Sequence, residues 1–203
     1  MVEPVRGVVL AGGQGRRLGG DKSMVQLGGR PLLLRPIDAM RAAGLDVAVV
    51  AKPDTRLPDL GAAVTIWREP QTPHHPLVGI AHALRACHAP IVVCAGDMPF
   101  VPAGVFALLA QCAGEVTVAA STHALQPVLG RYAPAVLDVI DAAIAEQRSM
   151  RGFIASLGGR VQTIGPDQLR PFGDPDAFMR DVDTPEDLRT ADATVGDPQR
   201  RTH

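Results

Sequence analysis

Short, almost wholly apolar segments recur along the chain, and this feature restricts the fold more than any other. Residues 47–51 (VAVVA) and 91–95 (IVVCA) contain no charged or amide side chain. Strands with such continuous apolar runs are buried on both faces, which is typical of a parallel sheet covered by helices. The same reasoning predicts strands at residues 5–10, 47–51, 64–67, 91–95, 116–120, 128–132 and 161–164.

Helix-like patterns fill most of the segments between these strands. We expect helices at residues 31–43, 77–86, 102–111, 134–147, 150–157 and 185–191. Prolines at four of these starts suit the first helical position, where a missing N–H leaves no hydrogen bond unmade. The alternation predicts one α/β domain over residues 1–191, with a Rossmann-like, mainly parallel sheet and helices on both faces. Residues 192–203 are polar, and we expect a disordered tail there.

The composition of the 203 residues fits a globular protein with one sizeable core, since 46% of them are hydrophobic. The net charge of −1 and the low aromatic content of 3% argue against a nucleic-acid partner. No apolar run reaches membrane-spanning length, and residues 1–6 do not resemble a signal peptide. Cys87, Cys94 and Cys112 lack the spacing of a disulfide or zinc framework, so we expect a cytoplasmic protein.

A glycine-rich loop, VVLAGGQGRRLGGDKS at residues 8–23, includes the end of the first predicted strand. Its five glycines between residues 12 and 20 let backbone N–H groups approach a phosphate closely. Lys22 is one of only two lysines in the chain, and a compact ammonium suits a phosphate cleft. Two well-known loops do not fit, because Leu18 breaks the dinucleotide fingerprint and Asp21 interrupts the P-loop pattern. A glycine-rich turn with solvated arginines is the alternative interpretation.

Two carboxylates are candidates for a metal site near this loop. In α/β sheets ligands bind beyond the carboxyl ends of the strands, and Asp97 follows the strand predicted at residues 91–95. Mg²⁺ prefers one or two carboxylates together with phosphate oxygens and water. Asp183 is the second candidate, and Asp181 is a weaker one. Each carboxylate also has a purely structural interpretation. Asp97 could cap a turn, and the negative charge of Asp183 could stabilise the N-terminal end of the last predicted helix.

Several motifs give the chain a family resemblance from about residue 5 to about residue 190. The loop reads LAGG at residues 10–13 and RLGGDK at residues 17–22. The other motifs are PLVG at 76–79, DMPF at 97–100, QPV at 126–128 and DVDTPEDL at 181–188. Together they resemble the motifs of the molybdenum cofactor guanylyltransferases, which are MobA-like nucleotidyltransferases.

The resemblance implies a nucleotide-diphospho-sugar transferase fold and a transfer of GMP from GTP to the terminal phosphate of Mo-molybdopterin. Pyrophosphate would leave, and Mg²⁺ would be the cofactor. GTP and molybdopterin would be the substrates, with cofactor-biosynthesis proteins or molybdoenzyme chaperones as partners. The implied catalytic residues are Lys22, Arg17 and Asp97, and the implied metal ligands are Asp97 and Asp183. The implied nucleotide contacts are Leu10, Ala11, Gly12, Gly13, Lys22, Glu69, Gly79 and Asp97.

Three departures from the family pattern leave the base and the acceptor open. The family often has an Asp after its third strand, and this chain has Arg68-Glu69, so Glu69 is a candidate replacement. His75 replaces a usual Gly, and DVDTPED at residues 181–187 is a spelling also seen among cytidylyltransferases. The alternatives are a cytidylyltransferase, a sugar-phosphate nucleotidyltransferase, a silent nucleotide-binding domain and a dinucleotide-dependent oxidoreductase. We expect GTP because the loop reads LAGG, whereas cytidine-specific relatives typically carry LAAG.

Overall fold

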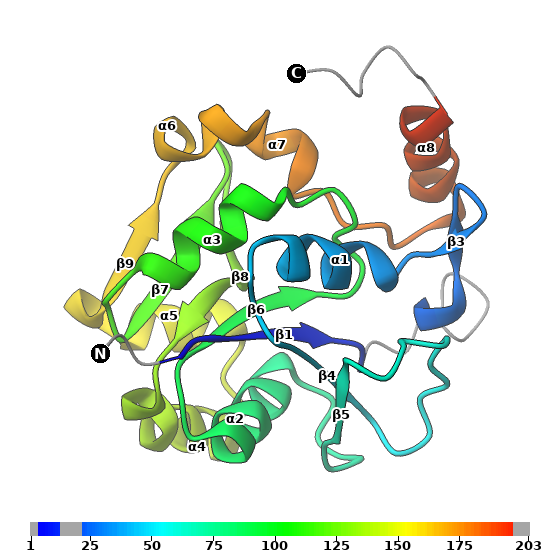
Figure 1. Cartoon of the computed structure of the whole chain (residues 1–203). Coiled ribbons are helices and arrows are strands. Elements are labelled where there is room, and N and C mark those ends of the chain that lie inside the picture. Colours follow the sequence, from blue (N-terminus) through cyan, green and yellow to red (C-terminus); the bar gives the residue numbers. More distant parts are fainter. Residues whose placement is uncertain (1–3, 13–21, 197–203) are drawn as a thin grey trace.

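The apolar segments predicted as strands all join one seven-stranded sheet in the computed structural model, which describes residues 4–12 and 22–196 (Figure 1). The strands are β1 (Arg6–Leu10), β4 (Val47–Ala51), β5 (Thr65–Arg68), β6 (Ile91–Ala95), β7 (Val116–Ala120), β8 (Leu125–Tyr132) and β9 (Val161–Ile164). Their order in the sheet is β5-β4-β1-β6-β8-β7-β9. The prediction of a mainly parallel sheet is confirmed, and four strands have the predicted bounds.

One strand, β8, runs against its neighbours. It pairs antiparallel with both β6 and β7, whereas the other pairs in this sheet are parallel. The reason is the connection from β7, which consists of residues 121–124 and closes with a hydrogen bond from Ser121 N to Ala124 O (3.0 Å). Such a short connection can only join antiparallel strands, because a parallel crossover needs a dozen residues or more. The start of β8 therefore lies at the edge where β6 ends.

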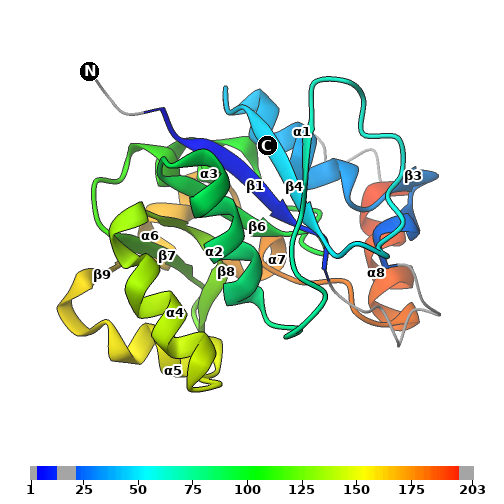
Figure 2. The ribbon, with the colours of Figure 1, turned by 90° about the horizontal axis from the view of Figure 1, so that it is seen from below.

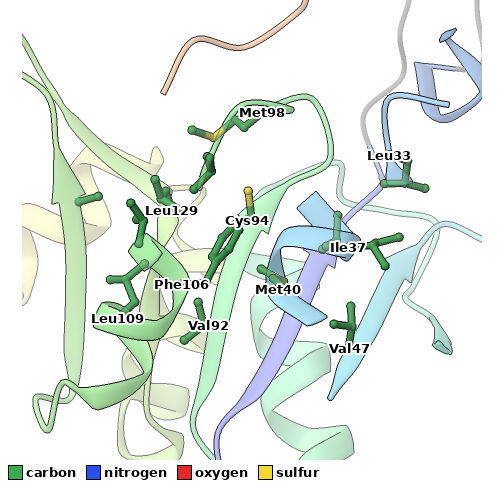
Figure 3. Close-up of a cluster of buried hydrophobic side chains, with 14 of the residues drawn as sticks. Leu33, Ile37, Met40, Val47, Val92, Cys94, Met98, Phe106, Leu109 and Leu129 are labelled. Carbon is green, nitrogen blue, oxygen red and sulfur yellow. The ribbon is translucent and has the colours of Figure 1, made fainter. Parts of the chain in front are cut away.

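Helices cover both faces of the sheet (Figures 1 and 2). On one face lie α1 (Leu34–Ala42) and α3 (Ala103–Gln111), and on the other lie α2 (Pro76–Cys87), α4 (Leu137–Ala145) and α5 (Met150–Ser156). Val9 is buried with the α1 and α3 side chains Met40 and Phe106, whereas Val8 is buried in the cluster on the opposite face. Figure 3 shows the cluster beneath α1 and α3. Burial on both faces explains why the inner strands β4 and β6 are apolar at every position, whereas the edge strands β5 and β9 carry exposed polar residues.

A small hairpin replaces the start of the first predicted helix. Strand β2 (Gln26–Leu27) pairs antiparallel with β3 (Arg30–Pro31), and the intervening Gly28 and Gly29 have φ of 62° and 71°. Glycine adopts such positive φ values without strain, which accounts for the Gly-Gly pair at this turn. The prediction of a helix from residue 31 is therefore wrong at its start, because α1 begins at Leu34.

Other helix boundaries also differ from the sequence prediction. The segment predicted as a helix at residues 134–147 begins with a 3₁₀ turn, Pro134–Val136, before α4. The sequence patterns do not predict α6 (Pro166–Leu169) and α7 (Pro175–Phe178), which are single helical turns that begin with proline. None of the helices within the described residues is long and apolar enough to cross a membrane.

The last helix, α8 (Pro185–Gly196), continues past the predicted end of the domain. Asp192 Oδ1 accepts a hydrogen bond from Gly28 N (2.7 Å), and Val195 packs against a cluster that includes Leu27 and Ala191. Ala191 and Val195 are four residues apart and so lie on the same face of the helix. The prediction of a disordered tail from residue 192 is therefore wrong for residues 192–196, while residues 197–203 lie outside the described residues.

Candidate functional site

The candidate site residues gather at the sheet edge where β1, β4, β5 and β6 end (Figure 1). Leu10 is the last residue of β1, and Asp97 lies two residues beyond β6. Ala11 N donates a hydrogen bond to Val50 O (2.8 Å), and Gly96 N donates one to Leu10 O (2.9 Å). These bonds extend the ladder past the strand ends, so the sheet fixes the start of the glycine loop relative to Asp97.

The ammonium group of Lys22 lies between two carboxylates. Its Nζ is 2.5 Å from Asp97 Oδ2 and also forms an ion pair with Asp183 Oδ1. The side chains of Lys22, Asp97 and Asp183 are 14%, 22% and 43% exposed, so solvent and ligands can reach the group. Residues predicted from three separate motifs therefore meet at one positive charge.

The start of α8 holds Asp183 beside Asp97. Val182 N donates a hydrogen bond to Asp97 O (2.9 Å), which ties the segment before α8 to the segment after β6. Thr184 N donates to Asp187 Oδ2 (2.8 Å), and Asp187 N donates back to Thr184 Oγ1 (3.1 Å). Asp183 N also donates to Asp187 Oδ2 (3.2 Å). This reciprocal capping fixes the backbone that carries Asp183.

The charges of this cluster shift the pKa values of its members. Burial acts to lower the pKa of Lys22, but the charges and hydrogen bonds of Asp97 and Asp183 outweigh it and raise that pKa. Burial acts to raise the pKa of Asp183, but the hydrogen bond and charge of Lys22 hold it below its ordinary value. Burial and the neighbouring Asp183 raise the pKa of Asp181. At neutral pH Lys22 is therefore a cation and Asp183 an anion.

The carboxylates of Asp97 and Asp183 suit a divalent cation, because both already contact the same positive charge. Within the described part of the chain, no group of three or more His, Cys, Asp or Glu side chains could hold a metal ion. Two carboxylates that leave the remaining positions to phosphate and water are the usual ligand set for Mg²⁺ bound with a nucleotide. Asp97 and Asp183 are therefore the residues that would hold the ion.

A cleft beside this cluster has about 820 Å³ of space, counting the part open to solvent. Its walls include Leu10, Gly12, Glu69, Gly79 and Asp97, all of which are predicted nucleotide contacts. The remaining lining residues are Lys52, His74, His75, Pro76, Ala95 and Val128.

A smaller hollow of about 270 Å³ adjoins the cleft and shares Leu10 and Asp97 with it. Ala11 and Lys22, two further predicted nucleotide contacts, line this hollow. The described residues among the predicted contacts thus lie around two spaces that share lining residues. Gly13 and Arg17 lie outside the described residues, and their roles stay predictions.

The carboxylate of Glu69 fills the space that two glycines leave open. A Cβ at Gly12 would lie 2.7 Å from Glu69 Oε1, and a Cβ at Gly79 would lie 3.2 Å from Glu69 Oε2. Glycine at these two positions therefore makes room for the acidic side chain. Sequence reasoning missed Lys52, which forms an ion pair with Glu69 in the same wall. The one available signal was that this chain of many arginines has a second lysine there.

Solved structures of nucleotidyltransferases share this fold. The molybdopterin-guanine dinucleotide biosynthesis protein A from Archaeoglobus fulgidus superposes with a TM-score of 0.77 at 25% identity, over 94% of this chain and 98% of that chain. A 2-C-methyl-D-erythritol 4-phosphate cytidylyltransferase from Thermus thermophilus gives a TM-score of 0.67 at 21% identity, over 94% and 98% of the two chains. The second likeness concerns the fold alone.

Residues 7–161 match the MobA-like NTP transferase domain, and the chain belongs to that family. It is 34% identical over 196 residues to a molybdenum cofactor guanylyltransferase of Cereibacter sphaeroides, covering 93% of this chain and 96% of the relative. A molybdenum cofactor guanylyltransferase of Rhizobium meliloti is 32% identical over 202 residues, covering 92% and 89%. The family resemblance inferred from the motifs is confirmed.

Proposed function

We propose that this protein transfers GMP from GTP to the terminal phosphate of Mo-molybdopterin, forming a molybdopterin guanine dinucleotide and releasing pyrophosphate. The observation that carries this proposal is the meeting of Lys22, Asp97 and Asp183 beside a cleft lined by predicted nucleotide contacts. The two relatives named as molybdenum cofactor guanylyltransferases support the choice of donor and acceptor.

Each residue of the cluster has a role in handling the triphosphate. Lys22 supplies a fixed positive charge for the phosphates, because its raised pKa keeps it protonated. Gly12 lets the backbone approach the nucleotide closely. Asp97 and Asp183 would hold Mg²⁺, which when bound supplies positive charge to the phosphate oxygens. Arg17 is proposed as a second cation for the phosphates.

The reaction needs positioning and charge more than a reactive side chain. An oxygen of the acceptor phosphate attacks the α-phosphorus of GTP, a new P–O bond forms, and the bond to pyrophosphate breaks in line with it. A covalent enzyme intermediate is not required. Cys94, the buried thiol behind Asp97, is a poor nucleophile because burial raises its pKa well above the ordinary value.

The direct test supplies the purified protein with Mg²⁺, molybdenum-loaded molybdopterin and either GTP or CTP. Pyrophosphate release gives the rate, and mass spectrometry identifies the dinucleotide. We expect a strong preference for GTP and no product when the acceptor is omitted. Equal rates with both donors, or a preference for CTP, would overturn the guanine assignment. Absence of turnover with either donor would overturn the proposal as a whole.

We also propose that the protein works in the cytoplasm and passes its product to cofactor-biosynthesis proteins or molybdoenzyme chaperones. The free thiols of Cys87, Cys94 and Cys112 fit a reducing compartment. Purification of a tagged copy from its own cells after cross-linking tests this. We expect such proteins in the purified complexes, and their absence would count against direct transfer.

A further inference from the structure

Lys52 and Glu69 form a buried ion pair in the wall of the cleft. Lys52 Nζ lies 3.3 Å from Glu69 Oε1, and the two side chains are only 3% and 5% exposed. Lys52 follows β4 and Glu69 follows β5, which are neighbouring parallel strands. Glu69 N donates a hydrogen bond to Ala51 O (3.0 Å), so the sheet itself fixes the separation of the two residues.

The ammonium group of Lys52 has protein partners for all three of its hydrogens. It donates to Pro70 O (2.6 Å) and to Pro73 O (3.1 Å), and its third partner is Glu69 Oε1. A lysine has three donors and no acceptor, so none remains for a phosphate. Lys52 therefore has a different role from Lys22, because it fixes two loop carbonyls and the Glu69 carboxylate in position.

Glu69 keeps an unused acceptor next to the glycines of the cleft. Its Oε2 is buried and has no hydrogen-bond partner among the described residues. The carboxylate lies between the backbones of Gly12 and Gly79, and all three residues line the cleft. A buried acceptor without a donor is costly, and a ligand N–H that reached it would remove this cost.

We propose that Lys52 is a positioning residue of the base subsite: it holds Glu69 by Oε1 as an ionised acceptor that reads a base with two adjacent N–H donors. The guanine edge offers this pair as its N1–H and its 2-amino group. Cytosine and adenine each place a ring acceptor beside their single amino group, which would face the carboxylate unfavourably. This inference rests on the proposed function, since it explains how the donor nucleotide is selected.

Lys52 acts on Glu69 through its charge as well as through the contact that positions the carboxylate. Burial raises the pKa of Glu69 above its ordinary value, and Lys52, with a smaller contribution from His74, limits that rise. Removing Lys52 would raise this pKa further and so shift Glu69 towards its neutral form, which carries a hydroxyl donor and accepts more weakly. Hydrogen bonds to an ionised group are about twice as strong as those to a neutral one.

The experiment compares the binding of GTP and ITP by titration calorimetry, because ITP lacks only the 2-amino group. Wild-type protein should bind GTP at least about tenfold more tightly than ITP, the value of one hydrogen bond to a charged group. Lys52→Met and the isosteric Glu69→Gln should each bring this ratio below about threefold. Arg85→Met removes a cation from an exposed ion pair with Asp141 and should leave the ratio unchanged.

A merely structural role for Lys52 would weaken GTP and ITP equally and keep their ratio, and that result would overturn the inference. If Lys52→Met does not fold, Glu69→Gln decides alone, and a wild-type ratio in that variant also overturns it. A wild-type protein that binds GTP well but does not distinguish it from ITP would contradict the inference and leave the transfer chemistry standing. Failure to bind any nucleoside triphosphate would remove the proposed function itself.

Discussion

The two lysines of this chain lie at the same sheet edge but in opposite situations. The side chain of Lys22 is 14% exposed and contacts two carboxylates that solvent reaches. The side chain of Lys52 is 3% exposed, and its three N–H donors all contact protein atoms. The first arrangement leaves a charge that can exchange partners when a ligand arrives. The second builds a rigid wall. The difference indicates that the phosphate side of the site is adaptable and that the base side is preformed.

The largest effect should come from the carboxylate side of Lys22. Asp97→Asn keeps the shape of the side chain and loses the charge that would hold Mg²⁺, so kcat should fall by about 10³-fold or more. Pyrophosphate release at saturating GTP measures this, and circular dichroism should show an unchanged fold. Asp183→Asn should be milder, since an amide oxygen can still ligate. A rate near that of the wild type for Asp97→Asn in Mg²⁺ would refute the metal assignment.

The two lysines should also differ in their contribution to stability, and here the loss should be larger for Lys52 than for Lys22. Lys52→Met leaves the buried Glu69 without its counter-ion and should cost about 3–5 kcal/mol of unfolding free energy. Lys22→Met removes two partly exposed ion pairs, with Asp97 and Asp183, and should cost about 1 kcal/mol. Urea unfolding at pH 7 compares the two variants. Equal losses would mean that Lys52 is no more structural than Lys22.

Binding of the nucleotide should depend directly on Lys22. Lys22→Ala removes a charge-assisted contact to the triphosphate and should weaken GTP binding by about 2 kcal/mol, or roughly 30-fold. Because the phosphates are common to all donors, GTP and ITP should lose affinity by the same factor. Calorimetric titration of both nucleotides tests this. Unchanged affinity would place Lys22 outside the phosphate site.

The smallest expected effect is a change of stability at acidic pH. Lys22 holds the pKa of Asp183 below its ordinary value of 3.8, so this ion pair stabilises the folded state above about pH 4. As the pH falls through the lowered pKa, Asp183 becomes protonated and the contribution is lost. The stability difference between wild type and Lys22→Met should therefore shrink between pH 5 and pH 2 by a fraction of a kcal/mol, or roughly one at most. A difference that stays constant over this range would show that the pair adds nothing to stability.

The sheet could be predicted from the sequence because inner strands such as β4 and β6 are apolar at every position. Its strand directions could not be predicted in full, because side-chain pattern carries no direction and only the short connection at residues 121–124 makes β8 antiparallel. The start of α1 was mispredicted because Pro31 suits the first position of a helix as well as a short strand. Local chemistry alone did not decide between them.

The candidate site, too, could be predicted only where local sequence determines the arrangement. Lys22 and Asp97 stand out by motif and by their place at strand ends, and Glu69 follows from the resemblance. The meeting of Asp183 with Lys22 depends on α8 returning to the sheet edge, which is a tertiary contact. Lys52 could not be identified because two of its three partners are backbone carbonyls of a loop, at Pro70 and Pro73. Such carbonyls leave no trace in side-chain identity.

The close approach of Gly12 to Glu69 also limits how this site can evolve. An alanine at position 12 would place its methyl group 2.7 Å from an oxygen that Lys52 prevents from moving aside. The shorter Asp at position 69 would withdraw that oxygen and make room. We therefore expect the effects of substitutions at residues 12 and 69 to be coupled, with Gly12→Ala tolerated better when Glu69→Asp accompanies it.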